Sequence, residues 1–266
     1  MSTSVRLENI EFSYGKLPVI RGITTDFIDG ELVSIVGPNG AGKTTLLKII
    51  SGLIQPVQGE VQVLGKQIDQ ISSKERGRLI CSVPQNPKLP SDMKLIDFVL
   101  LGRNAHLNLT KWEGPHDIQK AMTAMKLTDI EDLSGRNLGQ ISGGELQRGM
   151  LAMAITQESP VMLLDEPTSN LDLSHQSKVL NLIRKMHNEK NRTTIMAIHD
   201  LTLAAQYSTR MILISEGVIF ADGKPSEVLT KSNIAATYGA DVVIIPHPKG
   251  GSPVILPTSE DYPKVI

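Results

Sequence analysis

The sequence lacks cysteine pairs, long apolar runs and an excess of charge of either sign, and each absence excludes a class of protein. Cys81 is the only cysteine in 266 residues, so no disulfide can form within the chain. Its apolar neighbours predict a buried, unreactive thiol. The longest apolar runs, such as residues 161–164 and 211–214, are far shorter than the roughly 20 residues of a membrane-spanning helix. The sequence therefore predicts a chain that does not itself cross a membrane.

Charge is nearly balanced over the chain. Lysine and arginine number 27 against 28 acidic residues, which gives a formal net charge of -1. No global field favours a nucleic acid or an acidic membrane surface, so we expect no nucleic-acid partner. Residues 1–6 have neither the basic start nor the apolar core of a secretory signal, which predicts a cytoplasmic protein. With 40% hydrophobic residues, the chain can bury one large core or a core with a smaller subdomain.

The strongest motif has the spacing G-x-x-x-x-G-K-[ST] of a phosphate-binding loop, and its residues are Gly37, Pro38, Asn39, Gly40, Ala41, Gly42, Lys43, Thr44 and Thr45. An apolar, strand-type run at residues 32–36 precedes it, and a helical pattern follows it. The glycines allow backbone N–H groups to surround an anion at a helix N-terminus. We expect Lys43 to face the outer phosphates and Thr44 to ligate a magnesium ion that bridges two of them. A turn that only caps a helix is the weaker alternative, because Lys43 and Thr44 follow the last glycine.

A second apolar run, residues 161–164, ends in the adjacent carboxylates Asp165 and Glu166. In open α/β sheets, ligands collect at the carboxyl ends of the strands, so both acids are expected to face the phosphate loop. Magnesium prefers oxygen ligands, and we expect Asp165 to hold its shell while Glu166 lies toward a water that attacks the γ-phosphate. The alternative is a solvated acidic turn before Pro167, but an apolar run seldom ends in two acids without a use for them.

A glycine pair marks a second candidate phosphate site. The residues Ser142, Gly143, Gly144 and Glu145 have the spacing of a capping box that opens a helix over residues 146–156. A cap needs no glycines, whereas two of them at a helix start permit close approach of an anion to free N–H groups. Because the chain has two such sites and one lysine-bearing loop, the second site is expected to serve another molecule's nucleotide.

An aromatic residue and a histidine stand at strand ends. Tyr14 could stack on a nucleotide base, or it could simply cover the core, and the sequence does not separate the two. His199 could donate to a phosphate oxygen, although a lone histidine is more often structural. The other histidines have no second ligand at metal spacing and are expected at the surface: His106, His116, His175, His187 and His247.

The remaining pattern predicts how these motifs are arranged. β-type runs at residues 5–12, 19–23 and 25–28 predict an antiparallel edge sheet before the phosphate loop. The middle of the chain carries apolar positions at helical spacing, with a surface loop expected at residues 103–115. Strands and helices alternate in the second half, which predicts a parallel sheet with covering helices. Two apolar runs near the end of the chain resemble a hairpin.

Together the motifs resemble the nucleotide-binding subunit of ATP-binding-cassette (ABC) transporters over nearly the whole chain. The resemblance implies an enzyme that binds ATP and Mg2+ and hydrolyses ATP. It makes Tyr14 the adenine-stacking aromatic and Gln85 a glutamine that serves both the metal and the reaction. It makes Glu166 the catalytic glutamate, helped by Lys43 and by His199 as a switch histidine, and it assigns the signature to Ser142, Gly143, Gly144 and Glu145 and the following loop to Asp172. Two residues depart from the family pattern, since leucine is usual at Ile141 and alanine at Asn170.

The resemblance also implies a fold and a set of partners. The fold is α/β: a P-loop NTPase core with a mostly parallel sheet, an antiparallel β edge subdomain and an inserted helical subdomain. We expect one ABC ATPase domain over residues 1–266, with the core in 1–85 and 159–240, the helical subdomain in 86–158 and a hairpin and tail in 241–266. The implied partners are a second copy placed head to tail, membrane permease subunits and, indirectly, an extracytoplasmic substrate-binding protein. The chain is then expected at the cytoplasmic face of the cell membrane, as a peripheral protein.

Three segments bear on the cargo. Residues 101–106, 151–154 and 223–230 are similar to segments of importers for iron–siderophore complexes, haem and cobalamin, so we expect a subunit that powers import of a metal chelate or corrinoid. The alternatives are a soluble ABC ATPase of iron–sulfur cluster assembly, an importer subunit for another substrate, and a P-loop kinase, which would lack the signature. The apolar residues Met93, Leu95 and Phe98 are expected either in the core or in a groove that receives the permease.

Overall fold

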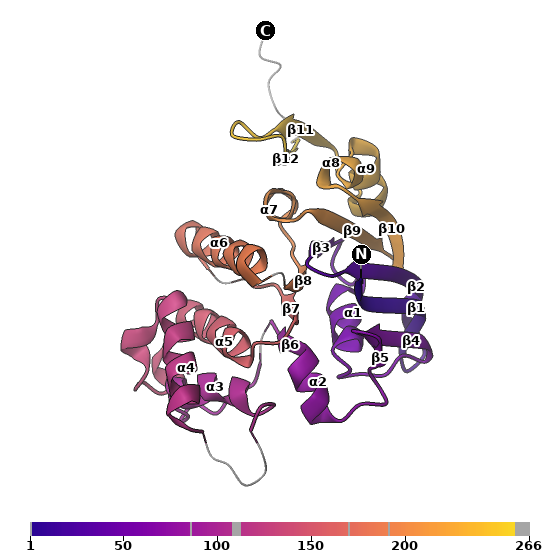
Figure 1. Cartoon of the computed structure of the whole chain (residues 1–266). Coiled ribbons are helices and arrows are strands. Elements are labelled where there is room, and N and C mark those ends of the chain that lie inside the picture. Colours follow the sequence, from indigo (N-terminus) through magenta and orange to yellow (C-terminus); the bar gives the residue numbers. More distant parts are fainter. Residues whose placement is uncertain (1, 86, 108–112, 170, 191, 259–266) are drawn as a thin grey trace.

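The computed structural model describes residues 2–85, 87–107, 113–169, 171–190 and 192–258. A central sheet, an antiparallel sheet and a small hairpin are arranged with helices around them (Figure 1). Asn170, part of the expected surface loop and the tail after residue 258 lie outside the described residues.

The central sheet has six strands. Their order is β10 (Val218–Gly223), β9 (Arg210–Ser215), β3 (Leu32–Val36), β8 (Thr193–Ala197), β7 (Val161–Asp165) and β6 (Ile80–Val83). The strands from β9 to β6 are parallel, and β10 runs antiparallel at the edge. Every residue of β3, β7 and β8 is buried, because helices or the second sheet cover both faces. The predicted mostly parallel sheet is confirmed.

The antiparallel sheet has the order β2 (Leu17–Ile28), β1 (Thr3–Tyr14), β4 (Gln58–Val63) and β5 (Lys66–Gln67). The sequence predicted two short strands where the structure has the single strand β2, so that prediction is wrong. Polar residues interrupt the apolar pattern because β1 and β2 are paired with shifts of register. At one shift, Asn9 has a φ of 48° and its N–H donates to the side-chain hydroxyl of Thr24 at 2.9 Å, so it keeps a partner where the ladder is interrupted.

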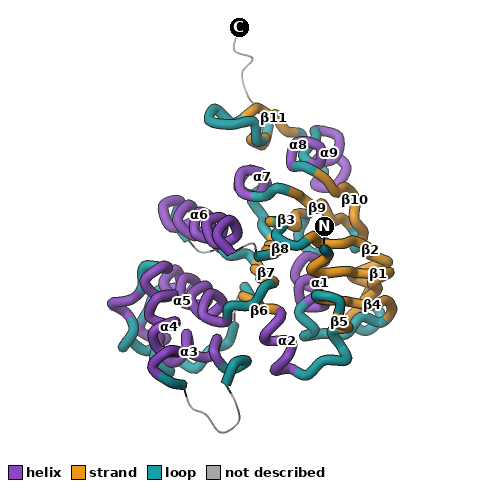
Figure 2. Tube along the Cα trace, in the orientation of Figure 1, coloured by secondary structure: helices purple, strands orange, loops and turns teal. Residues whose placement is uncertain are grey.

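The helices fall into groups along the chain. Helix α1 (Lys43–Ile50) follows β3, and α2 (Ser73–Leu79) precedes β6. The inserted helical part contains α3 (Leu95–Leu100), η1 (Leu101–Arg103), α4 (Pro115–Leu127), η2 (Glu131–Leu133), η3 (Leu138–Gln140) and α5 (Gly143–Gln157). The rest of the chain adds α6 (Leu173–Lys190), α7 (Leu201–Tyr207), α8 (Pro225–Val228), α9 (Lys231–Tyr238) and the predicted terminal hairpin of β11 (Val242–Pro246) and β12 (Pro253–Pro257). Helices α3, α4, α5 and α6 gather on one side of the molecule, and most strands lie on the other side together with α1, α8 and α9 (Figure 2).

Two hydrophobic cores lie on opposite faces of the central sheet. Alternate residues of β3 show this directly: Leu32 and Val36 belong to one core, and Val33 and Ile35 to the other. The first core packs the sheet against the inserted helices, α6 and α7, and the second packs it against α1 and the antiparallel sheet. The carboxyl edge of the sheet is left between the two layers, where the predicted site residues lie.

Several expectations for the helical part are corrected. Arg103, placed in a surface loop by the sequence, is 5% exposed and ends η1. Pro115, at the other end of that loop, is the first residue of α4. Leu95 and Phe98 are buried in the first core, so they cannot line a docking groove, whereas Met93 is half-buried against that core. The sequence misplaced Arg103 and Pro115 because it shows helical spacing but not which helices cover one another. For Leu95 and Phe98, the core was one of the two alternatives that it left open.

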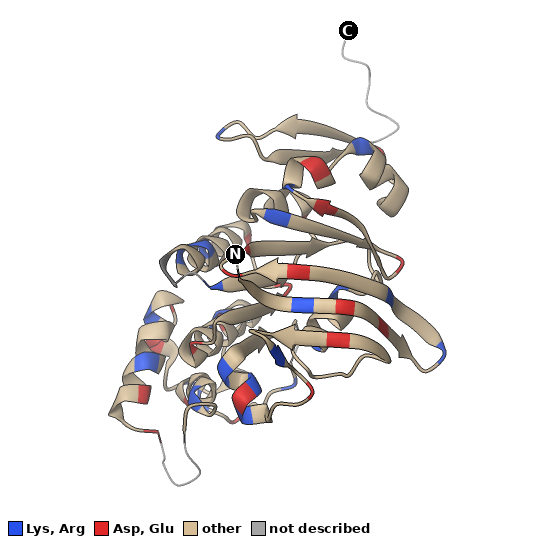
Figure 3. Cartoon of the chain, turned by 45° about the vertical axis from the view of Figure 1, so that its right-hand side comes forward, with Lys and Arg blue, Asp and Glu red and all other residues tan. Residues whose placement is uncertain are grey.

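The antiparallel sheet carries charged side chains of both signs. β1 and β2 each carry basic and acidic side chains, and the only charged residue of β4 is Glu60 (Figure 3). Within the residues that the structure describes, none of the helices combines the length and apolar character needed to span a membrane.

Candidate nucleotide site

The predicted site residues meet at one edge of the central sheet. The phosphate loop follows β3, Asp165 and Glu166 end β7, and His199 follows β8. These strands are adjacent and parallel, so their carboxyl ends lie side by side. Gln85 comes after β6, the neighbour of β7. A pocket of about 580 Å³ opens there and is lined by Tyr14, Leu17, Val19, Asn39, Gly40, Gly42, Lys43, Thr44, Thr45, Gln85, Glu166 and His199.

Two glycines of the phosphate loop are required by close packing. Gly37 has a φ of 150°, and a Cβ atom there would lie 2.1 Å from the carbonyl oxygen of Ile214 on β9. Gly42, the residue before α1, has a φ of 104°, and a Cβ atom there would lie 2.6 Å from Ile20. Any other residue would collide with the backbone of β9 at the first point and with the Ile20 side chain of β2 at the second, and its φ would be strained at both. The backbone N–H groups at the start of α1 therefore remain open to the pocket.

The Lys43 side chain folds back onto the start of the phosphate loop. Its ammonium donates to the carbonyl oxygens of Gly37 at 2.7 Å and of Pro38 at 2.9 Å. Burial lowers the pKa of Lys43, and the nearby carboxylates of Glu166 and Asp165 oppose this shift. The side chain thus brings a cation to the rim of the pocket, close to both acids.

Thr44 and Asp165 form the direct link between loop and strand. The Thr44 hydroxyl donates to a carboxylate oxygen of Asp165 at 3.0 Å. Burial raises the pKa of Asp165, whereas this hydrogen bond lowers it in part. The arrangement brings two hard oxygen donors together, as the sequence predicted. Within the described residues, no group of three or more His, Cys, Asp or Glu side chains gathers to hold a metal ion.

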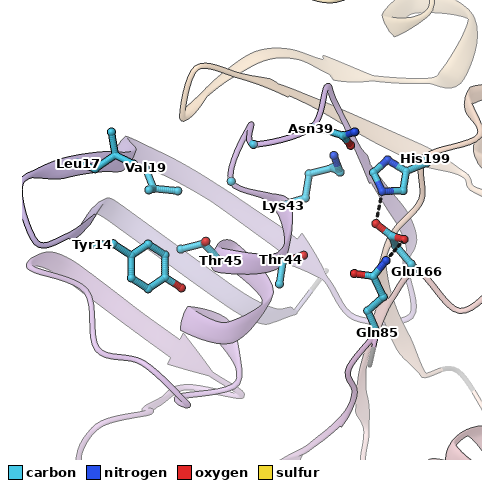
Figure 4. A pocket seen from close by; sticks show the side chains of 12 residues that line it. Tyr14, Leu17, Val19, Asn39, Lys43, Thr44, Thr45, Gln85, Glu166 and His199 are labelled. Atoms are coloured by element: carbon cyan, nitrogen blue, oxygen red, sulfur yellow. Dashed lines mark hydrogen bonds and ion pairs between the residues drawn. The ribbon is translucent and has the colours of Figure 1, made fainter. Parts of the chain in front are cut away.

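Glu166 is held by the chain from two sides (Figure 4). The Gln85 amide nitrogen donates to one carboxylate oxygen, and the His199 Nε2 atom pairs with the other. Glu166 is itself in the left-handed region with a φ of 52°, which turns its side chain toward the pocket after the extended strand β7. Two side chains, from the ends of β6 and β8, thereby converge on one carboxylate at the end of β7.

The opposite wall of the pocket is apolar. The Tyr14 ring packs edge-on against Phe12, with 4.9 Å between ring centroids, and stays half exposed toward the pocket. Leu17 and Val19 line the pocket beside it, and sequence reasoning did not assign them to the site. The hairpin register could have revealed them, since Tyr14 pairs directly with Leu17. This wall offers one aromatic and two aliphatic side chains in the same pocket as the phosphate loop.

The signature residues and Asp172 do not line the pocket. Ser142 caps α5 as predicted: its hydroxyl accepts from the Glu145 N–H at 3.3 Å, and Glu145 accepts from the Ser142 N–H at 2.6 Å. These bonds lower the pKa of Glu145. Asp172 caps α6 by accepting from the His175 N–H at 2.8 Å. Its carboxylate also pairs with the His175 ring, and this pairing is a contact that the sequence did not predict.

Three comparisons with known proteins agree with this site. A family model described as ABC transporter matches residues 20–169. The chain is 38% identical to the ferric enterobactin transport ATP-binding protein of Escherichia coli, over 97% of the chain and 96% of that protein. It is also 38% identical to the cobalamin import ATP-binding protein of Halobacterium salinarum, over 86% of the chain and 57% of that longer protein.

Solved structures give the same result. A protein assigned as a metal-chelate type ABC transporter, in an inward-facing conformation, superposes with a TM-score of 0.84 and 27% identity, over 97% of the chain and 99% of that chain. A dimeric ATP-binding cassette with bound ADP and phosphate superposes with a TM-score of 0.76 and 27% identity, over 83% of this chain and 98% of that cassette. The P-loop NTPase fold and the ATPase predicted from the sequence are confirmed. Because the family model spans more than half of the chain and a 38% identical relative spans nearly all of it, the chain belongs to the ABC transporter family.

Proposed function

We propose that the chain is the ATP-hydrolysing subunit of an importer and powers uptake of a metal chelate or corrinoid through a membrane permease. The observation that carries the proposal is the gathering of the phosphate loop, Glu166 and His199 in one pocket from three adjacent strands. Similarity to the ferric enterobactin and cobalamin proteins supports this class of cargo. As part of such a transporter, the chain would lie at the cytoplasmic face of the membrane, as a peripheral protein.

Each group in the pocket receives a role from what it can donate or accept. The loop N–H groups and Lys43 bind phosphate oxygens, and the exposed face of Tyr14 stacks on adenine. Glu166 orients the attacking water and accepts its proton. Gln85 and His199 hold that carboxylate in place, and His199 can also donate to a phosphate oxygen.

Magnesium is proposed to bind together with ATP. Thr44 and Asp165 would hold it, with the side-chain oxygen of Gln85 as a third candidate ligand. Two or three oxygen donors suit an ion that keeps several waters and takes few protein ligands, and the 3.0 Å contact between Thr44 and Asp165 brings two of them together. When bound, the ion would neutralise charge on the outer phosphates.

The remaining predicted residues are proposed to act on the nucleotide of a second copy. Ser142 and Gly143 are exposed at the start of α5, and no described atom lies within 4 Å of where a Gly143 Cβ atom would be. Asp172 is exposed as well. Open backbone at a helix start can receive a phosphate from outside the chain. The dimeric cassette with ADP and phosphate supports an arrangement of two copies.

The cargo is tested by uptake in cells that lack this chain. Labelled cobalamin, haem and ferric siderophores are offered separately, and uptake of one of them should be lost and should return with the wild-type chain but not with Lys43→Ala. Normal uptake of all of them, with a defect for an amino acid or sugar, would overturn the cargo while leaving the ATPase in place. Purification from detergent-solubilised membranes separates the iron–sulfur alternative, because a soluble assembly protein would not bring permease subunits with it.

A further inference from the structure

Residues 101–106 lie where the helical part of the chain meets the core. They form η1 and the turns after it, next to the C-terminal end of α5 on one side and α2 on the other. From that end of α5, the short segment of residues 156–159, here called the joint, leads directly into β7. The joint therefore connects the helix that begins after Ser142 to the strand that ends at Asp165.

Arg103 holds the joint from the helical side. Its guanidinium donates to the carbonyl oxygen of Thr156 at 2.9 Å and to the carboxylate of Glu158 at 3.0 Å. A third bond of 2.9 Å goes to Asp117 on α4. The side chain is only 6% exposed, so solvent screens these pairs little. Lys120 also pairs with Glu158.

The charges in this cluster are matched. The hydrogen bond from Arg103 lowers the pKa of Asp117 below its ordinary value. Burial works to raise the pKa of Glu158, but Lys120 and Arg103 lower it overall. Both carboxylates therefore stay ionised near neutral pH, and the planar guanidinium joins three acceptors at fixed angles.

The joint is also bonded to the core. The Gln157 amide donates to the carbonyl oxygens of Gly77 at 2.6 Å and Ile80 at 2.8 Å, and the Ser159 hydroxyl donates to Gly77 at 2.9 Å. Neighbours of Arg103 complete the contact. The His106 ring bonds the Gln157 carbonyl oxygen at 2.7 Å, and Arg78 on α2 donates to the Ala105 carbonyl oxygen at 2.7 Å.

Helix α5 is long, so a small tilt at the joint would displace its other end by a larger distance. With 15 residues it is about 22 Å long, so a tilt of about 10° at the joint would move Ser142 by about 4 Å. Displacements of about 1 Å already reduce turnover strongly when reacting groups must be aligned. The geometry of the joint thus determines where the signature lies relative to the acids of β7.

We propose that Arg103 is a positioning residue that fixes the joint and thereby holds the signature helix α5 in a defined orientation to β7. This inference rests on the proposed function, in which both ends act in ATP hydrolysis. The inference explains two residue types within 101–106. Glycine is needed at Gly102 because a Cβ atom there would lie 2.4 Å from the Met153 carbonyl oxygen, and arginine is needed at Arg103 for its two contacts with the joint.

The test uses the full chain with two spin labels. Exposed Glu8 on β1 and exposed Lys126 on α4 are replaced by cysteine, and buried Cys81 stays unlabelled. Pulsed dipolar spectroscopy then measures the distance distribution between core and helical part. Arg103→Lys keeps the charge but cannot reproduce the planar set of bonds, so it should broaden the distribution. Asp117→Asn is the matched control, since it weakens a bond of the same guanidinium that does not involve the joint.

Turnover is measured on the same proteins without labels. Arg103→Lys should lower kcat about tenfold while the Kd for a fluorescent ATP analogue stays within about twofold of wild type. Asp117→Asn should keep kcat and Kd within about twofold of wild type, although its urea midpoint of unfolding should fall about as much as that of Arg103→Lys. A wild-type distance distribution in Arg103→Lys, or equal effects of the two variants, would overturn the inference. The distance arm needs no turnover, so an inactive wild-type chain would refute the proposed function alone.

Discussion

His199 and Glu166 face each other from the ends of neighbouring strands, with the imidazole Nε2 atom paired to a carboxylate oxygen. Gln85 donates to the second oxygen of the same carboxylate. Both oxygens of Glu166 are thus engaged by side chains of the chain itself. Each oxygen keeps a second lone pair, so a water can use this carboxylate while both partners hold it, and the two partners come from parts of the chain on either side of β7.

Replacing Glu166 by glutamine should separate binding from turnover. Glu166→Gln keeps the shape and the contact with Gln85 but removes the proton acceptor, so kcat should fall about 100-fold or more while ATP affinity stays within about threefold. Gel filtration with ATP and Mg2+ should then show a stable dimer, because the bound nucleotide is not consumed. An unshifted monomer with normal hydrolysis would contradict the role given to Glu166.

Mixed dimers test whether Ser142 acts on the partner's nucleotide. Pairing a Ser142→Arg chain with a Lys43→Ala chain leaves one site whole if the sites are shared, because the intact loop of the first meets the intact signature of the second. Each mixed dimer should therefore have about half of the activity of a wild-type dimer. The two homodimers should both be inactive.

The matched control places both substitutions in one chain and pairs it with wild type. Shared sites then contain one defect each, so this mixture should be inactive in its mixed dimers. The reverse pattern, with active mixed dimers in the second mixture and inactive ones in the first, would show that each chain completes its own site.

Gly102 should tolerate no side chain. A Cβ atom at this position would lie 2.4 Å from the backbone carbonyl oxygen of Met153, so Gly102→Ala should destabilise the chain by about 1–3 kcal/mol. Gly135→Ala is the control, because nothing lies within 4 Å of its Cβ position. Urea unfolding followed by circular dichroism measures both, and equal midpoints would contradict the packing described for η1.

Cys81 should stay unreactive in the folded chain. Burial raises the pKa of its thiol from an ordinary value of 9.0 to about 12. Between these values the unfolded chain has lost the thiol proton and the folded chain keeps it, so wild-type stability should fall as pH rises above about 9. Cys81→Ala should lack this part of the slope. Labelling by a maleimide at pH 8 without urea would refute the burial.

The sequence predicted best those parts in which local spacing determines structure. The strand–loop–helix context of Lys43, the capping box of Ser142 and the runs that became β3, β7 and β8 are all found as predicted. In each, a short pattern such as glycine spacing or an unbroken apolar run has one physical explanation.

Parts that depend on distant contacts were predicted less well. Arg103 is charged and lies among turn residues, yet Asp117 and Glu158, far along the chain, allow it to be buried. Strand β10 was missed because its residues alternate between exposed and half-buried at a sheet edge. Leu17 was missed because its place in the site follows from pairing with Tyr14, and not from any property of leucine.

The pocket has a kinetic consequence, because its lining includes neither Ser142 nor Asp172. Under the proposed arrangement, in which a second copy supplies these groups, one subunit is half of a catalyst, and its rate per chain should rise with the concentration of chains until pairing saturates. A permease that holds two copies side by side replaces the bulk concentration with an effective concentration on the order of millimolar. Assembly with the permease would then activate hydrolysis, and free chains in dilute solution would hydrolyse little ATP.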